Sequence, residues 1–131
     1  MEEFIIFVRN KPHQLTRVCE MLSKHDVNIE SVASEVKGEN AIIKIVTNDP
    51  TKGKKALRDA GIPFETKEIL VVDLPNRPGE LSRFTKKIGL ANLNIESIYM
   101  IGNERLGSRK LAIRFNDMKK AKEILRENLS S

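Results

Sequence analysis

Apolar and polar positions follow two periods along this chain, and both periods occur in each half. Apolar runs and apolar–polar alternation predict β-strands, which we place at 4–8, 29–36, 41–46, 62–67, 68–74, 94–101 and 110–115. Apolar residues three and four positions apart predict amphipathic helices, which we place at 12–25, 51–61, 78–90 and 117–128. Glycine and asparagine in "KGEN" (37–40) and "GNERLGS" (102–108) predict two hairpin turns.

The two halves are copies of one another. Aligned without a gap, residues 10–32 and 76–98 are identical at 8 of 23 positions, where average amino-acid usage gives roughly one or two. The identical pairs include Asn10/Asn76, Pro12/Pro78, Arg17/Arg83, Asn28/Asn94 and Glu30/Glu96. After a two-residue insertion in the second copy, "TND" (47–49) aligns with "FND" (115–117). The sequence is therefore a tandem duplication.

The order of predicted elements is β-α-β-β-α-β, which is the ferredoxin-like plan. We expect an α+β fold of two tandem ferredoxin-like units with antiparallel sheets, at 1–67 and 68–131, joined with almost no linker. The second unit has no residues for its last strand, which would leave a sheet edge unpaired. A second copy of the chain could cover that edge, so we expect a homodimer.

The composition is that of a globular protein, with 40% hydrophobic and 31% charged residues. No run approaches the roughly 20 apolar residues of a membrane span, and the opening "MEEFIIFV" does not resemble a signal peptide. One cysteine, Cys19, cannot form an internal disulfide and favours a reducing compartment. We therefore expect a cytoplasmic protein without a membrane partner.

A net charge of +5 raises the question of a nucleic-acid partner. The lysines concentrate in "TKGKKALRD" and "DMKKAKEILREN", where basic and apolar residues alternate at helical spacing. A solvated helix face accounts for that layout, which argues against nucleic-acid binding.

The strand, the corner "NRPGEL" (76–81), the helix and the strand "LNIESI" (93–98) resemble the ACT domain, a family of small regulatory modules that bind amino acids and control metabolic enzymes. The resemblance covers nearly the whole chain, once per copy. The "NIES" strand is especially similar to regulatory subunits of acetolactate synthase. The resemblance implies an amino-acid ligand, allosteric control of amino-acid metabolism, and a metabolic enzyme as a partner.

The corner suits an amino acid on chemical grounds. A helix N-terminus offers unpaired N–H groups to a carboxylate, Pro78 suits the first helical turn, and Gly79 lets a ligand approach the backbone. Asn76 and Asn94 offer amide oxygens to the ammonium, and we expect both at the same end of the sheet. By resemblance to amino-acid-binding ACT domains, which commonly bind between two modules, the candidate ligand residues are Asn76, Arg77, Gly79, Glu80 and Asn94.

Two further expectations concern ligand identity and the first copy. Serine-sensing members carry histidine where this chain has Leu74, which argues against serine and hints at an apolar effector. The first copy keeps Asn10 and Asn28 but has His13 in place of the glycine. It is either a degenerate structural partner or a second site formed by Asn10, His13 and Asn28.

Other functions fit the sequence less well. With two histidines, one cysteine and one tyrosine, we find no catalytic constellation, no cofactor motif and no metal-ligand spacing. An RNA-binding ferredoxin-like protein needs aromatic residues on its third strand; "AIIKIV" has none, and "KLAIRF" has Phe115 only at its end. A structural or dimerisation module without a ligand remains an alternative, because Asn-x-Pro-Gly is also a good strand-to-helix turn.

Overall fold

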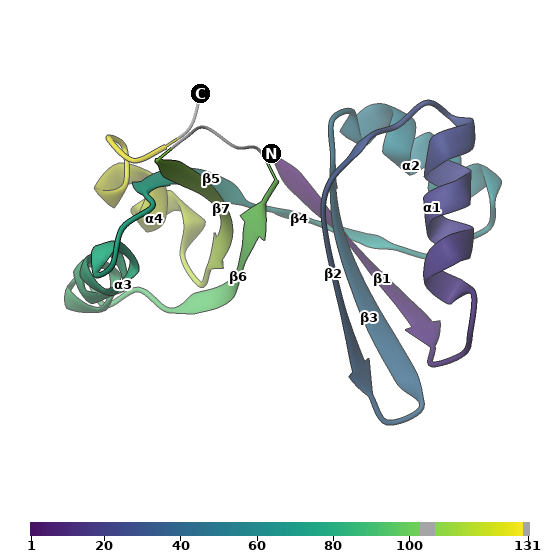
Figure 1. Cartoon of the computed structure of the whole chain (residues 1–131), viewed down its shortest axis with the longest axis horizontal. Coiled ribbons are helices and arrows are strands. Elements are labelled where there is room, and N and C mark those ends of the chain that lie inside the picture. The colour runs from purple at the N-terminus through teal and green to yellow at the C-terminus, as the bar shows by residue number, and fades with distance from the viewer. Residues whose placement is uncertain (103–106, 130–131) are drawn as a thin grey trace. The chain divides into compact units, whose positions relative to one another are not determined.

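The structure, a computed structural model, describes residues 1–102 and 107–129 (Figure 1). It divides into two compact units. The N-terminal unit comprises Glu2–Lys67, and the C-terminal unit comprises Met1 together with the described residues from Glu68 onward. None of the described helices is long and apolar enough to span a membrane.

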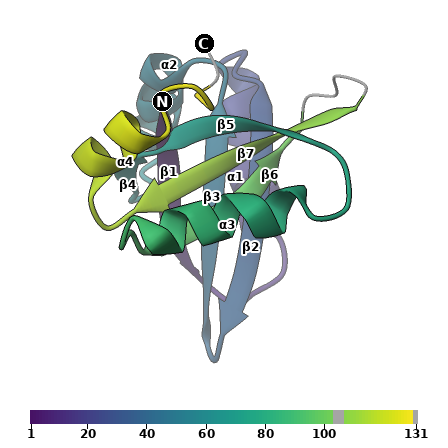
Figure 2. The same cartoon turned by 90° about the vertical axis from the view of Figure 1, so that its left-hand side faces the viewer.

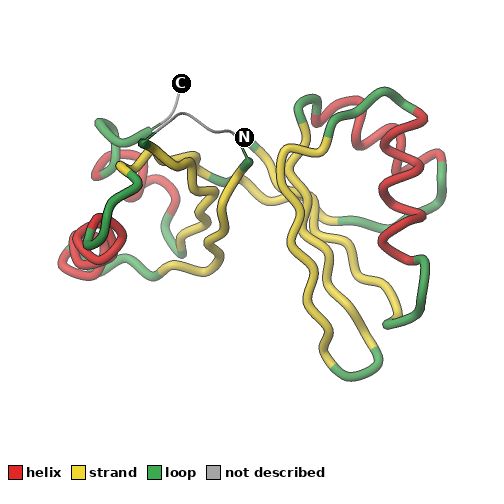
Figure 3. Tube along the Cα trace, viewed as in Figure 1, coloured by secondary structure: helices red, strands yellow, loops and turns green. Residues whose placement is uncertain are grey.

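The N-terminal unit is a complete ferredoxin-like fold. Its elements are β1 (Glu2–Arg9), α1 (Gln14–Lys24), β2 (Ile29–Lys37), β3 (Asn40–Thr47), α2 (Pro50–Asp59) and β4 (Glu65–Glu68). The strands form one sheet in the order β2-β3-β1-β4, and β3 pairs antiparallel with both β1 and β2. Both helices lie on the same face of this sheet (Figure 3).

Within its described residues, the C-terminal unit repeats this plan with three strands. Its elements are β5 (Leu70–Pro75), α3 (Glu80–Leu90), β6 (Ile95–Ile101), β7 (Ser108–Phe115) and α4 (Met118–Ile124). The antiparallel sheet has the order β5-β7-β6, with α3 and α4 on one face (Figure 2). A bridge between Val72 and Leu129 lies at the free edge of β5, where the Asp73 N–H donates to the Asn128 oxygen at 3.1 Å. The edge that we expected to be unpaired is therefore partly covered by the chain itself.

Each unit has its own apolar core between sheet and helices. The core of the N-terminal unit consists of Phe4, Ile6, Val18, Leu22, Val27, Ile43, Ile45, Ala56, Leu57 and Ile62. The core of the C-terminal unit consists of Leu70, Val72, Leu74, Phe84, Ile88, Leu93, Leu111, Ile113, Phe115, Ala121 and Leu125. The residues at helical spacing and on alternate strand positions are those that face inward.

The two cores fill one equivalent space with different residues. In the N-terminal unit the large residue is Phe4, and a Cβ on Gly53 would lie 3.0 Å from Phe4 Cζ and 3.5 Å from the Thr47 hydroxyl oxygen. The aligned residues of the C-terminal unit are Leu70, Phe115 and Ala121. The buried aromatic ring stands on the first strand in the N-terminal unit and on the third strand in the C-terminal unit, so equivalent core positions hold different residues.

The helix boundaries differ from the predicted ones at several ends. Helices α1 and α3 each begin two residues later than predicted, at Gln14 and Glu80, and α4 ends at Ile124 rather than at residue 128. The late starts share one cause, because the residue before each helix has a left-handed backbone. Most of the predicted turn at 102–108 lies outside the described residues.

Candidate functional site

The corner between β5 and α3 is a tight turn. The Glu80 N–H donates to the Arg77 oxygen at 3.3 Å, and Gly79 has φ 87° and ψ −14°. Proline at the second position and glycine with positive φ at the third are typical of a type II β-turn. Pro78 therefore serves the turn, and our expectation that it opens the helix is wrong.

Helix α3 begins without a side-chain cap. Its N-cap residue, Gly79, makes no side-chain cap hydrogen bond, and neither does His13, the N-cap residue of α1. Helices α2 and α4 are capped, since Asp49 accepts from the Lys52 N–H at 3.1 Å and Asp117 from the Lys120 N–H at 3.0 Å. In both units, therefore, the helix that follows the third strand has a side-chain cap, whereas the helix that follows the first strand has none. Uncapped N–H groups at a helix N-terminus can bind an anion.

Two arginines lie beside this open helix end and share one carboxylate. Arg77 and Arg83 donate to the same Glu80 oxygen, Oε1, at 2.8 and 2.7 Å. Hydrogen bonding to the Arg83 guanidinium, and then to that of Arg77, lowers the pKa of the Glu80 carboxyl below its usual range. The Glu80 side chain is 15% exposed, whereas both arginines are 68% exposed. Glu80 therefore stays ionised and neutralises part of this positive charge.

Arg83 also lies over the glycine. A Cβ on Gly79 would lie 3.4 Å from Arg83 Nη1, an ordinary contact distance. The space that we expected a ligand to use above Gly79 is thus next to a guanidinium group, which suits an anionic group.

Asn76 is held from both sides. Its N–H donates to the Gly107 oxygen at 2.8 Å, and its side-chain oxygen accepts from Arg109 Nη2.

Our sequence reasoning missed Arg83 and Arg109. The identity of Arg17 and Arg83 in the repeat was a usable signal for the first. Nothing in the sequence pointed to Arg109, because its position depends on the pairing of Leu74 with Arg109 across β5 and β7.

Asn94 lies at the other end of the sheet from Asn76. Asn76 follows Pro75, which pairs with Ser108, whereas Asn94 precedes Ile95, which pairs with Phe115. The intervening length of β7 separates the two asparagines by about 20 Å at the usual rise per residue. Our expectation that they share one end is wrong, and one unit alone cannot place both on one small ligand.

The backbone of Asn94 is fixed by Asn116. The Asn94 N–H donates to Asn116 Oδ1 at 2.9 Å, and the Asn116 N–H donates to the Asn94 oxygen at 3.1 Å. Asn28 and Asn48 make the same two bonds, at 2.9 and 3.1 Å. The repeated "ND" in the sequence was the signal for this pair.

Leu74 does not line the corner. It is 5% exposed and belongs to the core of the C-terminal unit. The hint of an apolar effector, which depended on Leu74 contacting the ligand, therefore has no structural support.

The first-copy candidates are also separated. Asn10 and His13 lie at the corner between β1 and α1, and His13 has φ 70°. Asn28 lies at the opposite end of its sheet, beside a pocket of about 490 Å³ that Cys19, Asp26 and Asn48 also line. His25 contacts the Met21 oxygen and Asp59. Among the described residues no group of three or more His, Cys, Asp or Glu side chains could hold a metal ion.

The family model for the ACT domain pair matches residues 1–131. The chain belongs to this family. No curated protein matches the sequence. Protein BT0572 from Bacteroides thetaiotaomicron is similar in structure, with a TM-score of 0.90 at 27% identity over 98% of this chain and 90% of that one.

Two further structures with the fold of this ACT domain pair have names that state a function. The regulatory subunit of aspartate kinase from Thermus thermophilus has a TM-score of 0.69 at 15% identity, over 95% of this chain and 87% of that one. The aspartokinase alpha and beta subunits give 0.61 at 13% identity, over 96% and 90%. At these identities the likeness concerns the fold.

Proposed function

We propose that this ACT domain pair is a non-catalytic regulatory protein that binds an amino acid at the corner of its C-terminal unit. The observation that carries the proposal is the uncapped start of α3 beside Arg77, Arg83 and Arg109. Family membership supports a regulatory role, and one protein with a similar fold is named a regulatory subunit of aspartate kinase.

In the proposed binding mode, each charged group of the ligand contacts protein groups of opposite charge or of complementary hydrogen-bonding role. The ligand carboxylate accepts from the first-turn N–H groups of α3 and from Arg77 or Arg83. Its ammonium donates to the Glu80 carboxylate and to the side-chain oxygen of Asn76. The ligand thereby enters the existing network around Glu80, in which two guanidinium groups share a single carboxylate oxygen.

Asn94 joins such a site only from a second module. Strand β6 is an edge strand of its sheet, and Ile98 and Met100 on it are 40% and 60% exposed. Antiparallel pairing of β6 with β6 of a second copy brings the start of one strand next to the end of the other. This pairing would place Asn94 of one protomer near the corner that carries Asn76 in its partner, so we propose a homodimer with ligand at the interface.

Regulation then follows from linkage. A ligand that contacts two modules favours the arrangement in which both contacts form, and it shifts the population toward that arrangement in proportion to its differential affinity. A metabolic enzyme that binds only one arrangement would be controlled by the ligand. This proposal requires no catalytic residue and no cofactor in the chain itself.

Thermal unfolding with each of the twenty amino acids at millimolar concentration tests the proposal. A ligand at 100 times its dissociation constant adds about 2.7 kcal/mol of stability, which raises Tm by several degrees for a chain of this size. Gly79→Asp places a carboxylate where the ligand carboxylate is proposed to bind, and it should abolish the ligand-induced rise in Tm. Gly79→Asn, with the same shape and no charge, should retain most of it. A flat response to all twenty amino acids would contradict the proposal.

A structural pairing module is the second candidate, and one observation favours it. Glu80 with Arg77 and Arg83, and Asn76 with Arg109, satisfy one another without a ligand. A dimer that forms with equal affinity in the presence and absence of amino acids would support this candidate. The RNA-binding alternative is weaker, because Phe115 on β7 is 2% exposed and cannot stack on a base.

A further inference from the structure

Helix α3 carries one exposed stripe of like charge on the side that faces away from its sheet (Figure 2). Residues three and four positions apart lie on one side of a helix. Four exposed residues of α3 have this spacing, and we call them the α3 stripe: Arg83, Lys86, Lys87 and Leu90. Phe84 and Ile88, on the opposite side of the helix, are buried in the core of the unit. The stripe therefore presents three cations and one leucine to solvent.

The two lysines of the stripe have no carboxylate partner. Among the described residues, Lys86 forms no ion pair, and Lys87 donates to the neutral oxygen Oδ1 of Asn128 at 3.3 Å. Arg83 does have a carboxylate partner, Glu80, at 2.7 Å. Cations three and four positions apart on a helix repel one another. Helix stability therefore gives no reason for this arrangement.

The equivalent stripe of α1 has another charge pattern. The aligned residues are Arg17, Glu20, Met21 and Lys24. Two cations and one anion give that stripe a net charge of +1, whereas three cations give the α3 stripe +3. The duplicated helices thus share their buried side but not this exposed side, so the stripe is a property of the C-terminal unit.

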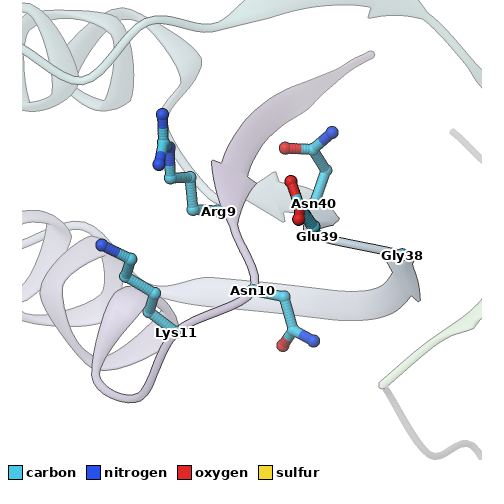
Figure 4. A pocket seen from close by; sticks show the side chains of 6 residues that line it. All are labelled: Arg9, Asn10, Lys11, Gly38, Glu39 and Asn40. Atoms are coloured by element: carbon cyan, nitrogen blue, oxygen red, sulfur yellow. The ribbon is translucent and has the colours of Figure 1, made fainter.

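Cations elsewhere on the chain stand near carboxylates. Arg9 and Lys11 line a pocket of about 480 Å³ in the N-terminal unit, and Glu39 lines the same pocket from the turn between β2 and β3 (Figure 4). On α4, Lys122 pairs with Glu68 at 2.7 Å. The lysines of the α3 stripe differ from these cations, because a carboxylate for them must come from another molecule.

We propose that the α3 stripe is a docking surface for an acidic segment of a partner protein. Carboxylates of that segment pair with Lys86 and Lys87, and one of its apolar side chains packs on Leu90. The helix dipole favours cations in the last turn of a helix, but it gives no reason for a leucine there that is 81% exposed. An apolar contact inside a ring of ion pairs does give one. The charge of the stripe selects an acidic partner over a basic one.

The inference rests on the proposed function for the identity of the partner, which is the regulated metabolic enzyme. Arg83 belongs both to the stripe and to the proposed amino-acid site, because it bonds Glu80 and lies over Gly79. The docking surface is therefore continuous with the place where the ligand is proposed to bind.

Amide NMR titration of the full chain with a short synthetic peptide, in which glutamates surround one central leucine, tests the inference in the absence of any amino acid. We expect the peptide to shift the signals of residues 83–90. A matched peptide with glutamine for glutamate should bind about tenfold more weakly, and one with alanine for leucine about threefold more weakly. Equal binding of the glutamate and glutamine peptides, or no shift in residues 83–90, would overturn the inference. A DNA duplex that binds these residues more tightly than the peptide would also overturn it.

Matched variants separate the stripe from the general positive field. Lys86→Glu gives α3 the charge that α1 has at Glu20 and should weaken peptide binding about tenfold. Lys52→Glu makes the same charge change at an exposed position of α2 and should alter binding less than twofold. Equal effects of the two variants would overturn the inference. Leu90→Gln should weaken binding of the leucine peptide but not of the alanine peptide, and equal losses for both would exclude the apolar contact.

The two proposals fail in different ways. If no amino acid raises Tm but the glutamate peptide still binds at residues 83–90, the proposed function is contradicted and the docking surface stands. If an amino acid raises Tm but the peptide does not bind there, only the docking surface is overturned.

Discussion

His13 and Gly79 occupy the same position in the two units and hold the same left-handed backbone, with φ 70° and ψ 3° at His13 and φ 87° and ψ −14° at Gly79. Each carbonyl accepts from the N–H four residues later, at 3.0 Å in both units. The corner therefore has one shape, whether glycine or histidine stands in it. The glycine alone does not mark the copy that binds a ligand, and the charges around each corner distinguish the two copies better.

His13→Gly should stabilise the protein. A left-handed conformation costs a residue with a Cβ about 1–2 kcal/mol, and the greater freedom of glycine in the unfolded chain offsets part of that gain. We expect a net increase of about 0.5–1 kcal/mol in the free energy of unfolding, measured by urea denaturation. Gly79→Ala is the reverse test and should lower that free energy by about 1 kcal/mol. A destabilised His13→Gly would show that the imidazole makes a favourable contact.

Two helical glycines should respond to alanine with opposite signs. A Cβ on Gly53 would lie 3.0 Å from Cζ of the buried Phe4 ring, whereas a Cβ on Gly89 would meet nothing within 4 Å. Alanine gains about 1 kcal/mol of helix propensity at either position, but overpacking at Phe4 costs about 1–3 kcal/mol. Gly89→Ala should therefore raise Tm, and Gly53→Ala should lower it. Equal shifts in calorimetry would contradict the tight contact with Phe4.

Thr47→Val should also raise stability. Thr47 is 1% exposed, and its hydroxyl has no hydrogen-bond partner among the described residues. An unsatisfied buried hydroxyl costs about 1–3 kcal/mol, which the nearly isosteric valine removes. Thr47→Ser keeps the hydroxyl and deletes a methyl group, so it should cost about 1 kcal/mol. Chemical denaturation of the three proteins should rank them valine, threonine, serine, and any other order would argue against an orphaned hydroxyl.

Lowering the pH should reduce the free energy of unfolding, in part through protonation of Glu80. Its pKa is lowered in the folded state by Arg83 and then by Arg77. A carboxyl with a lowered folded pKa contributes stability that is present above its unfolded pKa, about 4.3, and is lost as the pH falls through the folded value. Glu80→Gln should therefore destabilise the protein at pH 7, and the difference from wild type should shrink below about pH 4. The urea midpoint measured against pH tests this, and a constant difference would exclude the ion pairs as its cause.

Local patterns predicted the fold because both copies carry the same signals. The apolar periods placed every strand, and the matching "ND" dipeptides mark Asp49 and Asp117, which cap α2 and α4. The helix starts were missed by two residues because proline fits both a first helical turn and a type II turn, and the backbone of His13 gives no sign of positive φ in the sequence.

The candidate site was harder to predict because it depends on pairing between distant residues. Arg109 reaches Asn76 only through the register of β5 and β7. Asn94 was predicted at the wrong end of the sheet. Helix α3 runs back along the sheet after β5, so β6 begins at the end where β5 began, opposite the end that carries Asn76. The direction of each element, and not only its type, decides which residues meet.

The Asn94–Asn116 pair yields the last prediction. Asn116→Ala removes the acceptor of the Asn94 N–H and should cost about 1 kcal/mol, while Asn116→Asp retains an acceptor oxygen and should cost much less. Hydrogen exchange at the Asn94 amide should speed up in the alanine variant only, because the bond of 2.9 Å protects that amide. Asn48→Ala should have the same effect on Asn28, since the bonds are duplicated. If Asn94 exchange is unchanged in Asn116→Ala, the pair does not fix this strand start, and Asn94 must be held by other contacts.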